Sequence, residues 1–76
     1  MVRAFITAET AAGESEALQE QISGLDGVVE AHVIAGEYDI ITEAEGDEVY
    51  SVMHGVATNI RDLDGVVDTT TYICLE

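Results

Sequence analysis

Two stretches of this 76-residue chain, 22-ISGLDGVVE-30 and 60-IRDLDGVVD-68, are near copies of each other. The second begins 38 residues after the first, and the two are identical at six positions. Asp-Gly is a strong turn signal, and β-branched residues directly after it favour a strand. Each copy therefore predicts the end of a helix, a tight turn and the start of a strand.

Apolar residues at helical spacing precede both copies and predict helices over 14–23 and 48–61. We expect Gly24 to follow the first helix as its C′ residue and Asp47 to cap the second. Gly55 within the second helix costs about 1 kcal/mol relative to alanine, so we expect a close packing contact there. The apolar positions are Ala17, Leu18, Ile22 and Leu25 for the first helix, and Val49, Val52, Met53, Val56 and Ile60 for the second.

Four strands complete the expected architecture, over 2–9, 28–35, 38–44 and 66–75. The order is β-α-β-β-α-β, two copies of one unit, which is the ferredoxin-like α+β arrangement. Right-handed crossovers place both helices on one face of a four-stranded antiparallel sheet. We expect residues 1–76 to form a single domain.

Size and charge limit the classes of function. The chain has sixteen acidic residues, two arginines and no lysine, for a net charge of −14. This charge argues against direct nucleic-acid binding. The composition is similar to that of cytoplasmic proteins from salt-accumulating halophiles, although solubility alone is an alternative reason for acidity. There is no long apolar run for a membrane span, no signal peptide, and a single cysteine, so we expect a cytoplasmic protein.

A domain this small has a marginal core, so self-association is the favoured supplement. On the sheet face without helices, Phe5, Ile34 and Tyr72 would form an apolar patch. Such patches on soluble domains usually mark interfaces, so we expect dimerisation through this face.

The stretch 35-AGEYDII-41 reads as a hairpin, with Gly36 first in a two-residue type II′ turn. Tyr38 and Asp39 could hold an amine or a polar ligand, or could be an ordinary hairpin tyrosine beside a solvated acid. The hydroxyls of Thr69, Thr70 and Thr71 could likewise serve a ligand, or simply reflect the strand preference of threonine.

The remaining reactive side chains form no recognisable catalytic or metal-binding set. His54 is expected on the exposed flank of the second helix, and His32 on the helix-free face of the sheet. Cys74 has no activating base nearby in the sequence and is interpreted as a packing residue. We therefore expect no enzyme activity, no cofactor and no metal.

The motifs together resemble the effector-binding domain of the Lrp/AsnC family of regulators, also called the RAM domain, over essentially the whole chain. The matching motifs are Gly27-Val28, Gly36-Glu37-Tyr38-Asp39, Gly65-Val66, and Thr69 with Thr71. The resemblance implies dimers that pair through their sheets as in dimeric α+β barrels, larger assemblies of dimers, and amino acids or similar effectors bound between dimers.

Carried over by position, the resemblance implies ligand contacts from Gly36, Tyr38, Asp39, Thr69 and Thr71. The usual N-terminal helix-turn-helix is missing from this sequence, so we expect an effector-binding and oligomerising module that acts with a partner such as a full-length regulator. A small enzyme of the dimeric α+β barrel group, using His32 between sheet and helices, is the alternative, and an ACT-like regulatory domain ranks third.

Overall fold

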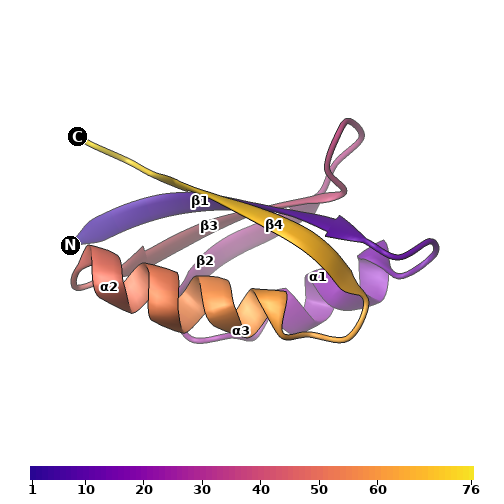
Figure 1. Ribbon diagram of the computed structural model, residues 1–76, viewed down its shortest axis with the longest axis horizontal. Helices are drawn as coiled ribbons and strands as arrows, with labels where there is room; N and C mark the ends of the chain where they lie inside the picture. Colours follow the sequence, from indigo (N-terminus) through magenta and orange to yellow (C-terminus); the bar gives the residue numbers. More distant parts are fainter.

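A computed structural model describes residues 1–76 and shows one sheet with the helices on one side of it (Figure 1). The strands run in the order β2-β3-β1-β4, and every neighbouring pair is antiparallel. This confirms the predicted ferredoxin-like fold. The elements are β1 (Val2–Thr10), α1 (Ser15–Ser23), β2 (Val28–Val33), β3 (Ile40–Gly46), α2 (Val49–Ser51), the π-helical η1 (Val52–Val56), α3 (Ala57–Arg61) and β4 (Val66–Ile73).

The two sequence copies form the same turn, as predicted. Gly27 and Gly65 have φ values of 87° and 98°, a left-handed conformation that favours glycine. In both turns the valine after the glycine donates its N–H to the leucine carbonyl three residues earlier, at 3.2 Å. Each turn thereby passes the chain from a helix directly into a strand.

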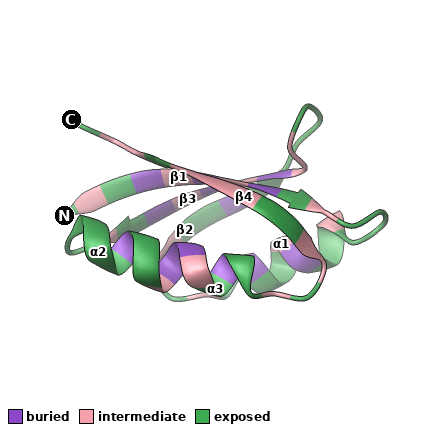
Figure 2. Cartoon of the chain, viewed as in Figure 1, coloured by how far each residue is buried: buried purple, intermediate pink, exposed green.

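The core lies between the sheet and the helices, as the buried stripes in Figure 2 show. On β1 and β3 every second side chain is fully buried, and these side chains pack against the apolar faces of the helices. The polar member of the set is Thr42, whose Oγ1 has no hydrogen-bond partner. The fully buried members are Ala4, Ile6, Ala8, Ile40, Thr42 and Ala44 from the strands, with Ile22, Val52 and Ile60 from the helices.

The second helix differs from its prediction because its middle is π-helical. The Ala57 N–H bonds to the Val52 carbonyl five residues earlier, and the Thr58 hydroxyl donates to the Met53 carbonyl at 3.1 Å. The buried side chains of this helix are Val52, Val56, Ala57 and Ile60, whereas Val49 and Met53 are exposed rather than buried. The expected packing contact at Gly55 is wrong, because a Cβ there would meet nothing within 4 Å.

The predicted helix ends also need correction. Glu48, with extended backbone, precedes α2 in place of Asp47, and no side chain caps that end. Gly24 ends α1 with φ −89°, so the left-handed residue of this connection comes later, at Gly27. Ala17 is exposed, whereas Leu18 and Ile22 are buried as expected. None of the helices is long and apolar enough to cross a membrane.

Candidate functional site

The connection between β2 and β3 is longer than the predicted two-residue turn. The strands end and begin at Val33 and Ile40, and the Ile34 N–H donates to the Asp39 carbonyl at 2.8 Å, which leaves a loop over 35–38. Gly36 does not have a positive φ, so the type II′ prediction is wrong. The loop rises from the sheet on the side away from the helices (Figure 1).

Asp39 ties this hairpin to the end of β1. Its backbone N–H donates to the Ala8 carbonyl at 2.9 Å. Its carboxylate oxygen Oδ2 accepts from the Thr10 N–H at 2.8 Å and from the Thr10 hydroxyl at 3.3 Å. The Thr10 hydroxyl also lies 2.8 Å from the hydroxyl of Ser15, the first residue of α1. The carboxylate therefore belongs to a network that joins the hairpin, β1 and α1.

Tyr38 ties the hairpin to the opposite edge of the sheet. Its hydroxyl lies 2.8 Å from Thr70 Oγ1, and both side chains are half-buried. Thr70 pairs with Thr7 of β1 and therefore lies on the sheet face without helices. The two predicted hairpin side chains thus hold the loop at two separate points.

The predicted threonines lie on the other face of β4. Thr69 and Thr71 pair with Ala8 and Ile6, whose side chains are buried under the helices. Because side chains alternate along a strand, these two threonines face the helix layer and only Thr70 faces Tyr38. The structure brings Gly36, Tyr38 and Asp39 together in one hairpin, and it separates Thr69 and Thr71 from them.

Two residues of the network, Thr10 and Ser15, were missed by the sequence interpretation. Serine is common as the capping residue before a helix, and Ser15 lies one position beyond the Glu14 cap, so the sequence indicates only that it is near the helix start. Nothing in the sequence pairs Thr10 with a carboxylate 29 residues away, since that contact depends on how two strand ends meet.

The hairpin retains hydrogen-bonding groups that the fold does not use. None of the backbone N–H groups from Ala35 to Tyr38 makes a hydrogen bond within the chain. The second carboxylate oxygen of Asp39, Oδ1, also has no partner in the chain. Free N–H groups suit an anion and a free carboxylate oxygen suits a cation, so the loop offers both kinds of partner within one short segment.

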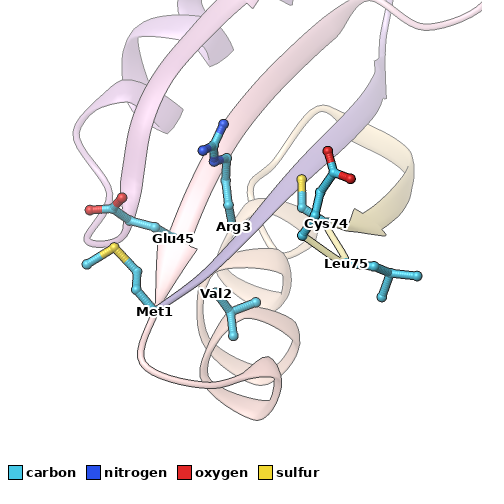
Figure 3. A pocket seen from close by; sticks show the side chains of 7 residues that line it. Met1, Val2, Arg3, Glu45, Cys74 and Leu75 are labelled. Carbon is cyan, nitrogen blue, oxygen red and sulfur yellow. The ribbon is translucent and has the colours of Figure 1, made fainter.

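Two hollows lie at the ends of the sheet. One, of about 480 Å³, lies at the start of α1 and is lined by Gly13, Ser15, Glu16, Ala17 and Val33. The other, of about 340 Å³, lies between the two chain ends and is shown in Figure 3. There Cys74, half-buried, donates its N–H to the Arg3 carbonyl at 2.9 Å. The first hollow borders the Thr10–Ser15 network, whereas the second is remote from the hairpin.

The sheet face without helices carries the expected apolar side chains. Phe5 pairs directly with Tyr72, which is 56% exposed, and Ile34 is 36% exposed. His32 also lies on this face, with Nε2 2.7 Å from Glu30 Oε1. It does not lie between sheet and helices, where the alternative enzyme interpretation needs a polar residue.

The other predicted histidine lies where expected. His54 is exposed on the second helix, and its ring stacks on Tyr50 with centroids 4.4 Å apart.

Fold and hairpin together define a ferredoxin-like α+β domain with one bare sheet face and a loop held at two points. The Lrp/AsnC ligand-binding domain family matches residues 3–76. The chain therefore belongs to the Lrp/AsnC ligand-binding domain family, as its motifs suggested.

Individual relatives agree with this assignment. An uncharacterised helix-turn-helix-type transcriptional regulator of Pyrococcus abyssi is 33% identical over 57 residues, which are 75% of this chain and 38% of that protein. The matched residues thus cover well under half the length of this relative. A solved structure from Thermus thermophilus matches with a TM-score of 0.92 and 28% identity, covering 100% of this chain and 95% of that one.

A more distant solved structure has the same fold. It is a transcriptional regulator of Neisseria meningitidis in complex with L-methionine, with a TM-score of 0.84 and 19% identity. The match covers 99% of this chain and 50% of that one.

Proposed function

We propose that this chain is a regulatory module that binds a small effector, an amino acid, at the β2–β3 hairpin. The observation that supports it most is the combination of free groups at that hairpin: unpaired N–H groups from Ala35 to Tyr38 beside the unpaired Oδ1 of Asp39. An amino acid has one ammonium and one carboxylate. The carboxylate of Asp39 suits the first, and the loop N–H groups suit the second.

Family membership supports the regulatory part of the proposal. The Pyrococcus abyssi relative is a transcriptional regulator, and the Neisseria meningitidis regulator was solved with L-methionine. We extend the amino-acid class, though not the particular amino acid, from that protein to this chain.

Assembly is the second part of the proposal. We infer that two copies pair through the sheet face that carries Phe5 and Tyr72, and that dimers assemble further around the hairpins. The apolar side chains exposed on this face support the pairing. Contacts from Thr69 and Thr71 to an effector stay a prediction, and they would be made from the helix side of β4.

Residues 1–76 contain two arginines and no lysine, so we propose that DNA contact is made by a partner, such as a full-length Lrp/AsnC-type regulator. We also propose that the module works in the cytoplasm at high salt. Salt screens the mutual repulsion of a domain with a net charge of −14 and thereby favours association.

A thermal-shift screen with the twenty amino acids in molar potassium chloride tests the effector. An amino acid at a hundredfold excess over its Kd adds about 2.7 kcal/mol, which raises the Tm of a domain this size by about 10–20 °C. We expect a subset of amino acids to give such a shift and Asp39→Ala to abolish it.

The matched control is Asp62→Ala, which removes an exposed aspartate beyond the end of α3 and should leave the shift unchanged. A flat screen, with oligomers intact by light scattering, contradicts effector binding and leaves only a structural role.

A further inference from the structure

We propose that Thr10 is a positioning residue for the Asp39 carboxylate, which it turns so that only Oδ1 is available to an effector's ammonium. The inference rests on the proposed effector site and names the group that orients it. Thr10 itself does not touch the effector; it acts through Asp39.

Two donors from one residue fix one carboxylate oxygen. The Thr10 N–H and hydroxyl both reach Oδ2 of Asp39, at 2.8 and 3.3 Å. Hydrogen bonds to a charged acceptor are stronger than those between neutral groups, and two donors from different directions restrict rotation of the carboxylate. Oδ1 is left as the free oxygen.

The hydroxyl of Ser15 sets the direction of this network. When the Thr10 hydroxyl donates to Asp39, its lone pairs remain available to accept the Ser15 O–H, which lies 2.8 Å away. Every proton then points toward the carboxylate, an order in which each bond polarises the next. Ser15 also lines the hollow of about 480 Å³ at the start of α1, so the network ends beside that hollow.

The backbone of β1 supports the same assignment. The Ala8 carbonyl accepts the Asp39 N–H and therefore points to the β3 side of the strand. N–H groups two residues apart on a strand point to the same side, so the Thr10 N–H is also directed at the hairpin. The next residue, Ala11, points the other way, and its N–H donates to the Gly65 carbonyl at 2.8 Å.

The binding test compares L-methionine with its α-hydroxy analogue, 2-hydroxy-4-(methylthio)butanoate, which lacks the ammonium. Thr10→Val keeps the shape and the N–H and removes the hydroxyl. We expect it to weaken methionine binding by about tenfold, the equivalent of one hydrogen bond to a charged group, and to leave binding of the analogue unchanged. Thr10→Ser should restore methionine binding. Equal weakening of both ligands, or no weakening of either, overturns the proposal.

A second measurement needs no ligand. Three-bond couplings of the Asp39 β-protons by NMR report rotation about the Cα–Cβ bond, which the hydrogen bonds from Thr10 to the carboxylate also restrict. They should show one rotamer in the natural protein and averaged rotamers in Thr10→Val. A single unchanged rotamer in Thr10→Val overturns the positioning role, whether or not any probe binds. Averaged rotamers together with a flat screen of all twenty amino acids support the positioning role and count against the effector site, so the two failures are distinguishable.

Ser15→Ala should give partial averaging, because it removes the donor behind the Thr10 hydroxyl. Ser23→Ala is its matched control: Ser23 is the last residue of the same helix, and its hydroxyl bonds only with Gln19. Equal averaging of the Asp39 rotamers in Ser23→Ala and Ser15→Ala would contradict the proposed chain of hydrogen bonds from Ser15 through Thr10 to Asp39.

Discussion

The two turns formed by the repeated sequence have the same backbone and different surroundings. A Cβ added at Gly27 would lie 2.5 Å from Val56 Cγ2 and 3.1 Å from the Glu45 carbonyl oxygen. At Gly65 the nearest atom is the end of the Leu18 side chain, at 3.1 Å. A backbone oxygen and a β-branched side chain cannot move aside as a leucine tip can. The local sequence therefore determines the turn, and the opposite half of the domain determines how much change the turn tolerates.

The largest expected effect tests this difference directly. Gly27→Ala and Gly65→Ala both force alanine into a left-handed conformation, at about 1–2 kcal/mol. Gly27→Ala adds overpacking of about 1–3 kcal/mol, so we expect it to lower the free energy of unfolding by about 2–5 kcal/mol in total. Denaturant titration in molar potassium chloride, at one protein concentration for all variants, measures both losses.

Val56→Ala is the control for the overpacking. In the Gly27→Ala background it should restore part of the lost stability, whereas in the natural background it should cost stability. Equal losses for Gly27→Ala and Gly65→Ala, without rescue by Val56→Ala, would show that the two turns do not differ in this way.

A smaller effect is expected from a difference between the first strands of the two repeat halves. Thr42 in β3 lies 38 residues after Ala4 in β1 and so takes the equivalent position in the second half; both side chains are fully buried. Because Thr42 Oγ1 has no partner, Thr42→Val should raise the free energy of unfolding by about 1 kcal/mol. The same titration measures it. Thr70→Val, which removes a hydroxyl that bonds to Tyr38, should lower stability instead. A loss of stability in Thr42→Val would reveal an unseen partner of the hydroxyl, such as a bound water.

The smallest effect is expected from the helices. Only the second helix has a π-helical segment, and Gly55 lies within it without side-chain neighbours. Gly55→Ala should raise the unfolding free energy by at most about 1 kcal/mol, because alanine is the better helix former. If light scattering instead shows that the variant no longer self-associates, the open space beside Gly55 is occupied by a neighbouring copy.

Most of the fold was predictable because it depends on local patterns. The repeated Asp-Gly turns, together with the helically spaced apolar residues that precede each of them, predicted the β-α-β-β-α-β order. The π-helical segment was not predictable, because the apolar spacing in 48–61 fits an ordinary α-helix. Nor does that spacing tell that Val49 and Met53 are exposed, which depends on how the helix lies on the sheet.

The hairpin was predictable in position and not in form. Gly36 next to Glu37 suggested a two-residue turn, yet Asp39 is drawn to β1 by Ala8 and Thr10, and this opens the loop. Which β4 threonine faces Tyr38 depends on the register between β1 and β4. Both alternating sets of that strand contain threonine, so composition alone cannot choose between them. The form of the loop and the threonine that faces Tyr38 therefore depend on contacts between distant strand ends, which local sequence does not show.

The strand order has a consequence for synthesis and folding. Neither half of the repeat contains a hydrogen-bonded strand pair of its own: β1 bonds with β3 and β4, and β2 bonds with β3. A nascent chain therefore cannot form any part of this sheet until β3 has left the ribosome. One edge of β1 then remains unpaired until β4 follows. Every ladder joins one half to the other, so the domain folds as one cooperative unit.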